Sequence, residues 1–141
     1  MRVLADFEGD WQLTREIVPG AGPVARFAGT ARWQAAAGGL DYIEVGTLHL
    51  PGAAPMRAER RYRWEADLRV YFDDGGFFHQ VPAAGGAATH WCDPDTYRVT
   101  YDFAAWPCFD TVWDVRGPRK GYAMRTRFAR LGAGAAAPGV P

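Results

Sequence analysis

The 141-residue sequence contains no serine, only two cysteines and no excess of either charge. Without serine, a Ser-His-Asp hydrolase is excluded. Cys92 and Cys108 are too few for a disulfide scaffold, so we expect both thiols to be reduced. Sixteen Lys and Arg residues balance sixteen Asp and Glu residues. This balance gives no electrostatic support for binding nucleic acid or a membrane surface.

Long apolar segments are also missing. No apolar run approaches the roughly 18 residues that are needed to cross a bilayer. The first ten residues, MRVLADFEGD, place acids where a signal peptide needs its apolar core. No long stretch combines helical spacing with good helix formers. We therefore expect a cytoplasmic protein with little helix.

Aromatic residues and turn formers are abundant instead, with 20 Trp, Tyr and Phe, 17 Gly and 10 Pro. The clearest pattern is in RRYRWEADLRVYF, residues 60–72. Because strand side chains alternate between two faces, this run predicts one strand that buries its even positions. These inward positions are Tyr62, Trp64, Ala66, Leu68, Val70 and Phe72.

TYRVTYDF and GYAMRTRFAR alternate in the same way, and short connections rich in Gly, Pro and Asp separate the runs. Such connections suit antiparallel hairpins and exclude parallel crossovers. We predict eight to ten strands in up-and-down order. Closing such a sheet removes its edges, so the predicted fold is a single all-β antiparallel barrel over residues 1–131, with a two-sheet sandwich as the alternative. Residues 132–141 are predicted to form a flexible tail of Gly, Ala and Pro.

FEGDW contains Gly9-x-Trp11 directly before the first predicted strand, and the last predicted strand ends in Arg130. This combination resembles the lipocalins and their wider calycin superfamily, in which the tryptophan closes one end of the barrel beneath an arginine of the last strand. The resemblance implies that Gly9, Trp11 and Arg130 close this barrel, with Arg130 in a cation–π contact over the indole. The Thr-Asp-Tyr triplet of the secreted lipocalins has only a loose counterpart in residues 120–122.

Four further strings, RRYRW, FFHQ, HWCDPDTY and WDVRGPRKGY, are present. They resemble an uncharacterised bacterial family of small lipocalin-like (calycin superfamily) proteins, over most of the chain up to Arg130. This narrower resemblance implies the same fold and no established activity.

Two arginines and one glutamate fall on the apolar side of the alternation. Arg15 shares a face with Leu13, and Arg60 shares one with Trp64. Glu44 should lie close to Arg60 across the turn at residues 51–55. A buried charge is costly unless it is paired, so one arginine lacks a partner. A ligand carboxylate or phosphate could supply that partner, unless both arginines reach solvent at the strand ends.

The predicted function is therefore to bind a small, anionic and partly apolar molecule inside the barrel. Fatty-acid-binding calycins hold a carboxylate with Arg and Tyr side chains, which the resemblance extends to this chain. The basic turn RGPRKGY should lie at the open mouth and steer the anion inward. The candidate ligand-binding residues are Arg15, Glu44, Arg60, Tyr62, Trp64, His79, His90, Tyr97, Tyr101, Trp113, Arg119, Lys120 and Tyr122.

The room inside such a barrel is limited by its many inward aromatic residues. An eight-stranded barrel is just wide enough to be filled or to hold one small ligand. Small inward residues should leave some space, namely Ala25, Gly29, Ala31, Gly46 and Ala66. A narrow aromatic pocket is expected, with a packed barrel as the alternative.

The histidines suggest two further hypotheses. His79 shares a face with Phe77, and His90 shares one with Cys92. Their spacing matches no metal motif, so no metal and no cofactor are predicted. An interior His acting with Tyr or with Asp95 as an acid–base pair would make the barrel a small enzyme. An interaction module without a ligand is the third hypothesis, and a homodimer is left open.

Overall fold

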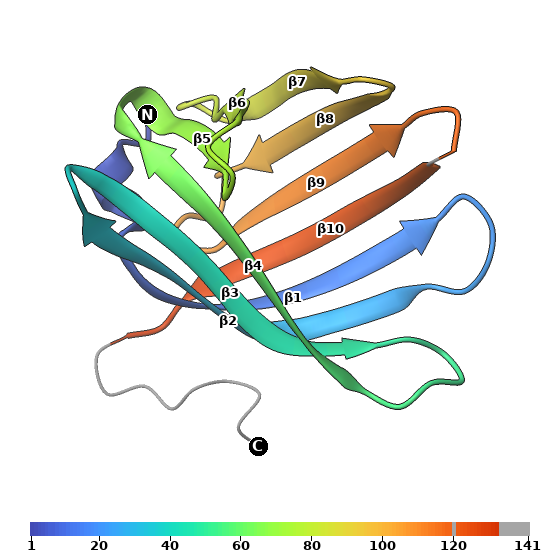
Figure 1. Cartoon of the computed structure of the whole chain (residues 1–141). Helices are drawn as coiled ribbons and strands as arrows, with labels where there is room; N and C mark the ends of the chain where they lie inside the picture. The colour runs from blue at the N-terminus through green and yellow to red at the C-terminus, as the bar shows by residue number, and fades with distance from the viewer. Residues whose placement is uncertain (120, 133–141) are drawn as a thin grey trace.

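The computed structural model describes residues 1–119 and 121–132 (Figure 1). Ten antiparallel strands of these residues form one sheet in the order β6-β5-β4-β3-β2-β1-β10-β9-β8-β7. Two short 3₁₀ helices accompany it, η1 (Leu4–Phe7) and η2 (Ala66–Leu68). The strands are β1 (Gly9–Pro19), β2 (Ala25–Ala36), β3 (Gly39–His49), β4 (Met56–Glu65), β5 (Arg69–Phe72), β6 (Phe77–Gln80), β7 (Gly86–Cys92), β8 (Asp95–Asp102), β9 (Phe109–Arg116) and β10 (Gly121–Arg130).

The sheet bends over into a nearly closed barrel, which confirms the predicted all-β, up-and-down architecture. In Figure 1, β2, β3 and β4 cross in front of β1 and β10, with the interior between the two layers. β1 pairs with β10, so the first and last strands lie side by side. β6 and β7 approach each other from opposite ends of the sheet, but no backbone ladder joins them among the described residues. We call this junction the seam.

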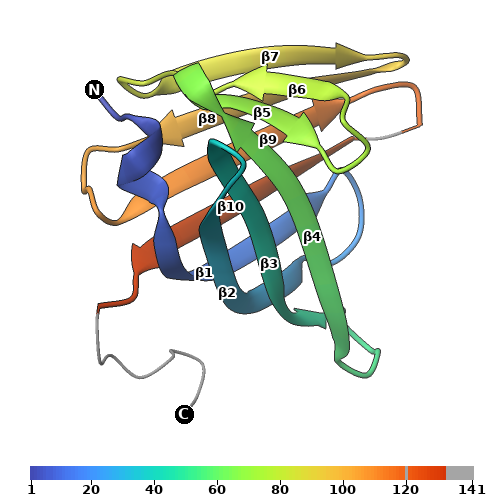
Figure 2. The same cartoon turned by 60° about the vertical axis from the view of Figure 1, so that its left-hand side comes forward.

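The two ends of the barrel differ. Figure 2 shows η1 at one end, beside the connection between β8 and β9. At the opposite end lie the turns that join β1 to β2, β3 to β4, β7 to β8 and β9 to β10 (Figure 1). We call these the helix end and the hairpin end. The turn that contains RGPRKGY lies at the hairpin end, away from Arg130, as its position before the last strand predicts.

Two glycines allow the sheet to fold over. Gly29 of β2 faces Gly46 of β3 across the ladder. A Cβ on Gly29 would lie 2.1 Å from the carbonyl oxygen of Val45, and one on Gly46 would lie 2.3 Å from the carbonyl oxygen of Ala28. The two strands therefore approach too closely for any side chain at either position, as happens where a sheet bends sharply.

The strand predicted across residues 60–72 was wrong in its middle. Asp67 and Leu68 have φ angles of 63° and 61°, and they turn the chain through η2 between β4 and β5. Because the turn breaks the alternation, Ala66 is exposed rather than inward, although Leu68 remains buried.

The prediction that Phe77 and His79 share a face was also wrong, because the Phe77 side chain is 49% exposed whereas His79 is buried. The register between β5 and β6 shifts at Val70 and Tyr71. After this irregularity, Phe78 and His79 are both buried although they are adjacent in sequence. A β-bulge changes which face a residue occupies, so simple alternation fails there.

The predicted tail lies outside the described residues except for Gly132, which is exposed. Among the residues that the structure describes, no helix has the length and apolarity needed to cross a membrane.

Candidate ligand site inside the barrel

Trp11 and Arg130 meet at the helix end. The Trp11 side chain is fully buried, and its indole N–H donates a hydrogen bond to the carbonyl oxygen of Phe7 at 2.9 Å. The Arg130 guanidinium lies 4.3 Å from the centre of the indole, so the predicted cation–π contact is present. Arg130 also donates to the carbonyl oxygens of Asp6 and Glu8, which ties η1 to the last strand.

Gly9 is needed for this arrangement. Its φ of +127° disfavours other residues, and a Cβ there would lie 3.0 Å from Nη1 of Arg130. Rings around Trp11 fill the rest of the helix end. Phe7 contacts Trp33, Trp64 and Trp106 with ring centres 5.0 to 5.7 Å apart. The helix end is therefore packed with aromatic side chains.

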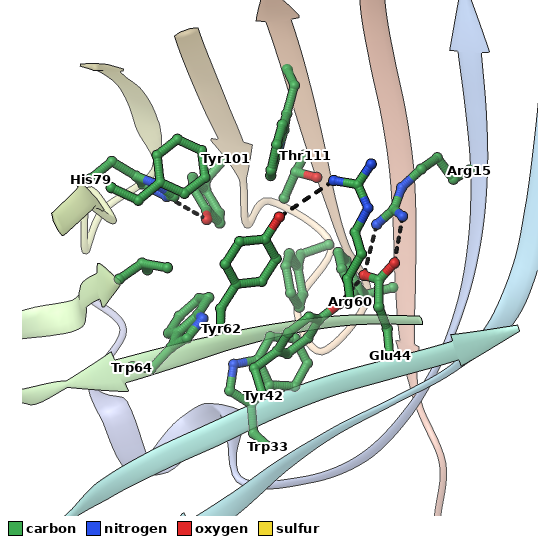
Figure 3. Close-up of a pocket in the computed structure, with 15 residues that line it drawn as sticks. Arg15, Trp33, Tyr42, Glu44, Arg60, Tyr62, Trp64, His79, Tyr101 and Thr111 are labelled. Carbon is green, nitrogen blue, oxygen red and sulfur yellow. Dashed lines mark hydrogen bonds and ion pairs between the residues drawn. The ribbon is translucent and has the colours of Figure 1, made fainter. Parts of the chain in front are cut away.

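A small cavity of about 40 Å³ lies deeper in the barrel. This volume would hold roughly three water molecules, or one compact polar group. Figure 3 shows the polar side chains of its wall pointing toward one another. The lining residues are Arg15, Trp33, Tyr42, Glu44, Arg60, Tyr62, Trp64, Val70, Phe78, His79, Tyr101, Phe109, Thr111, Trp113 and Phe128.

Arg15 and Glu44 form a buried ion pair at one side of the cavity. Glu44 is 1% exposed and Arg15 is 8% exposed. Two guanidinium nitrogens of Arg15 donate to the two Glu44 oxygens at 2.5 and 2.9 Å, while Nε of Arg15 donates to Thr126 at 2.8 Å. Tyr42 adds a third hydrogen bond to Glu44 at 2.5 Å. Such bidentate, charge-assisted contacts are what a buried pair needs.

A glycine of β2 leaves room for the side chains of Arg15 and Glu44 to meet across that strand. Arg15 lies on β1 opposite Phe27 of β2, and Glu44 lies on β3 opposite Ala31 of β2. The inward position between Phe27 and Ala31 is Gly29, which has no side chain. Arg15 can therefore reach over β2 to the carboxylate of β3.

The ionisation of the pair follows from competing effects. Burial alone would raise the pKa of Glu44, but the hydrogen bonds and charge of Arg15, helped by Tyr42 and by the charge of Arg60, outweigh it and lower this pKa. For Arg15, burial opposes the charge, yet Glu44 raises its pKa overall. Burial next to Glu44 raises the pKa of Tyr42 well above its usual value. At neutral pH the carboxylate and guanidinium are thus charged and Tyr42 keeps its proton.

Arg60 is a second cation of the cavity wall, and it takes no part in the Arg15–Glu44 ion pair. It faces Glu44 across the β3–β4 ladder, as predicted, but the carboxylate is bound to Arg15 instead. Among the described residues, the side-chain contacts of Arg60 are a 3.4 Å hydrogen bond to the Tyr62 hydroxyl and the Trp113 ring, 5.7 Å from the guanidinium. The cavity wall therefore carries two positive charges and one negative charge.

His79 and Tyr101 form a second polar contact on the opposite wall. Nε2 of His79 lies 2.9 Å from the Tyr101 hydroxyl oxygen. His79 is 3% exposed, and burial, with a smaller effect of His90, lowers its pKa to about 4. Burial raises the pKa of Tyr101. Both groups are therefore neutral at physiological pH.

Eight of the candidate ligand-binding residues line the cavity: Arg15, Glu44, Arg60, Tyr62, Trp64, His79, Tyr101 and Trp113. Four others do not. His90 and Tyr97 are half-buried neighbours across the β7–β8 ladder, and their rings contact the Phe78 ring. Tyr122 is half-buried on β10, and Arg119 is exposed in the last turn. Lys120 lies outside the described residues.

Seven lining residues were not among the candidates, namely Trp33, Tyr42, Val70, Phe78, Phe109, Thr111 and Phe128. Tyr42 and Thr111 occupy inward positions of their strands, and the alternation in DTVWDV could have identified Thr111. Phe78 could not have been found in this way, because the register shift at Val70 and Tyr71 changes its face. Within the part of the chain that the structure describes, no group of three His, Cys, Asp or Glu side chains is arranged to hold a metal ion.

Comparisons with known proteins agree with this architecture. A family model with the description "Family of unknown function (DUF6314)" matches residues 7–130. The chain belongs to this family. The matched segment starts at Phe7 of the helix end and stops at Arg130, so it includes the Trp11–Arg130 contact and all ten strands. A comparison with curated proteins finds no match.

A solved structure with a similar fold is the S-type phycobiliprotein lyase CPES from Guillardia theta. The TM-score is 0.64 over 92% of this chain and 90% of that chain, with 9% sequence identity. An identity this low shows a shared lipocalin-like barrel fold and nothing about the ligand.

Proposed function

We propose that this barrel binds a small organic anion, and that Arg60 is the cation that pairs with its carboxylate or phosphate. The observation that carries the proposal is the uneven number of charges in the barrel wall. Glu44 is already occupied by Arg15 and Tyr42. Arg60 thus keeps a net positive charge without a carboxylate at ion-pair distance among the described residues. An anion would supply the missing partner and two parallel hydrogen bonds.

The surroundings of Arg60 suit an anion with a short apolar body. The hydroxyls of Tyr62 and Thr111 also line the cavity and can donate to an oxyanion. Trp113 and Phe128 supply apolar walls. The cavity volume favours a ligand whose charged group is compact, with the rest of the molecule directed toward the hairpin end, because the helix end is packed.

The proposal can be tested with pentanoate and its neutral analogue pentanamide, titrated into the protein by calorimetry. Wild type should bind pentanoate more tightly than pentanamide. Arg60→Met should remove this preference, which corresponds to roughly 1.5 to 3 kcal/mol, or about 10- to 150-fold, for a hydrogen-bonded charge. Met keeps much of the apolar stem of Arg60, so the barrel should still fold.

Arg61→Met is the matched control. Arg61 is the next residue of β4, but its side chain lies on the outer face and pairs with Glu59. Removing that charge should leave the pentanoate preference intact. Equal affinities of wild type and Arg60→Met for pentanoate would contradict the anion site. Natural ligands can be sought separately, by comparing native mass spectra of the ligand-depleted protein before and after exposure to a cell lysate.

The second candidate is an acid–base enzyme, which the buried His79–Tyr101 contact favours. A time-dependent change in the NMR spectrum of an acid incubated with the protein, lost in His79→Phe, would support it. The cytoplasmic location and the lack of nucleic-acid and membrane partners stay predictions from the sequence, and a homodimer stays open.

A further inference from the structure

The charges around the cavity do not balance. Among the lining residues of the described chain, Arg15 and Arg60 are positive and Glu44 is negative (Figure 3). His79 adds no charge at neutral pH, because burial lowers its pKa to about 4. The lining tyrosines add none either, since phenols are neutral at this pH. The cavity wall therefore carries one positive charge in excess.

The negative charge is fixed in the wall. Glu44 is 1% exposed, and its two oxygens accept hydrogen bonds from Arg15 and Tyr42. All three guanidinium nitrogens of Arg15 donate in turn, two to Glu44 and one to Thr126. The charge of Arg15 is thus compensated within the protein, and Arg60 alone is left to compensate a ligand.

Glu44 lies close enough to Arg60 to act on an anion that is bound there. The two residues face each other across the β3–β4 ladder, and the charge of Arg60 helps to lower the pKa of Glu44. The first negative charge of a ligand would bring the wall to neutrality. A second negative charge would have no cation of its own and would be repelled by Glu44.

We propose that Glu44 restricts this site to singly charged ligands, so that the ligand is a monocarboxylate and not a phosphate monoester. This inference rests on the proposed anion site and names the residue that sets its charge selectivity. The cavity of about 40 Å³ holds one compact group, so both charges of a phosphate would lie together at Arg60. At neutral pH a phosphate monoester carries nearly two charges, whereas a carboxylate carries one.

Three ligands with the same butyl chain separate the effect of charge from that of shape. Pentanoate ends in a planar carboxylate, and butanesulfonate ends in a tetrahedral group with one charge. Butyl phosphate ends in a tetrahedral group whose second pKa is about 6. Each is titrated by calorimetry into wild type at pH 7.5. Pentanoate and butanesulfonate should bind roughly tenfold more tightly than butyl phosphate, a moderate penalty for an unpaired charge because Arg60 is only half-buried.

The same titrations at pH 5.5 change the charge of butyl phosphate. If only its monoanion binds, its affinity relative to butanesulfonate should rise by about 25-fold, the factor by which the monoanion fraction increases. Butanesulfonate is singly charged at both pH values, so this ratio removes effects of pH on the protein that act on both ligands. The wall keeps its charges over this range, because the pKa of Glu44 is lowered and that of Arg15 is raised.

Glu44→Gln tests the assigned residue. Without the carboxylate the wall carries two positive charges, so the penalty against butyl phosphate at pH 7.5 should disappear. Glu59→Gln is the matched control, because Glu59 pairs with Arg61 on the outer face of β4. This control should keep the wild-type preference, and an equal preference in Glu44→Gln would overturn the assignment. If Glu44→Gln does not fold, the ratio of butyl phosphate to butanesulfonate in wild type decides.

Arg60→Met separates the possible failures, because it should weaken the binding of all three ligands. If it does so but butyl phosphate binds wild type at pH 7.5 as tightly as butanesulfonate, the anion site stands and the charge limit is wrong. If butanesulfonate binds as weakly as butyl phosphate at both pH values, the shape of the head group decides and the role of Glu44 is wrong. If Arg60→Met weakens none of the ligands, or if none binds wild type, the anion site and this inference are both wrong.

Discussion

The Arg15–Glu44 pair gives the sharpest test of how charge is balanced inside this barrel. Glu44→Gln preserves the size and shape of the side chain but removes the negative charge. The amide keeps one acceptor oxygen and replaces the other with an NH₂ donor, whereas the carboxylate accepts two hydrogen bonds from Arg15 and one from Tyr42 on its two oxygens. Arg15 would then be a buried cation without a counter-ion, close to a second cation, Arg60.

The expected loss of stability is about 3 to 5 kcal/mol, the usual consequence of removing one partner of a buried ion pair. With a urea m value of about 2 kcal/mol/M, the midpoint of unfolding should fall by roughly 1.5 to 2.5 M. Urea titrations followed by tryptophan fluorescence measure this shift. Glu59→Gln is the matched control, because Glu59 pairs with Arg57 and Arg61 on the outer face. An exposed pair contributes about 1 kcal/mol or less.

The double variant Arg15→Met, Glu44→Gln decides whether charge is the cause. Replacing both ions with neutral groups leaves neither member of the pair as an uncompensated buried charge, so the double variant should be more stable than Glu44→Gln alone. Added pentanoate should also stabilise Glu44→Gln more than wild type, because two cations are then free. Arg15→Met alone completes the comparison. If the changes in the free energy of unfolding of Arg15→Met and Glu44→Gln add up to that of the double variant to within about 0.5 kcal/mol, the pair is not coupled and the reasoning is refuted.

The remaining predictions concern the helix end and the buried histidine. Trp11→Ala should lower the free energy of unfolding by about 3 to 5 kcal/mol, since a fully buried indole is lost; a loss below about 1 kcal/mol in urea titrations would show that Trp11 does not hold this end together. His79 should make the fold acid-sensitive, because its pKa is about 4 in the folded state and near 6.5 in the unfolded state. Between these values the unfolded chain binds the extra proton, so stability falls as pH decreases, by about 2 kcal/mol from pH 7 to pH 5. The difference between wild type and His79→Phe at the two pH values isolates this effect, and equal losses in both proteins would contradict it.

Strand alternation was sufficient to predict the faces of the long strands. Leu13 and Arg15 of β1 and Val99 and Tyr101 of β8 are buried as expected, because these strands are regular and have one apolar face. The Gly-x-Trp motif located the helix end. Alternation failed between residues 66 and 78, where η2 and the register shift between β5 and β6 change the face without a clear signal in the sequence.

The charged site was predictable only in part. Alternation placed Arg15, Glu44 and Arg60 inside, and the turn between β3 and β4 correctly placed Glu44 opposite Arg60. The alternation pattern could not show which of the two arginines binds the Glu44 carboxylate. That choice depends on Gly29, which leaves β2 without a side chain between Arg15 and Glu44, and on the bend of the sheet. Both are properties of three strands together, whereas the sequence pattern describes one strand at a time.

The seam between β6 and β7 sets how the barrel can move. Aromatic contacts bridge it, with the His90 ring 5.6 Å from Phe78 and 6.4 Å from Phe77, in place of backbone hydrogen bonds among the described residues. Side chains can slide and change rotamer without breaking a ladder, so the barrel can widen here at lower cost than between any two paired strands. Amide protons of β6 and β7 should exchange with deuterated solvent before those of β1 and β10, whose ladder runs from Trp11 to Pro19. A molecule larger than the resting cavity would then gain room by lateral expansion of the wall next to Phe78.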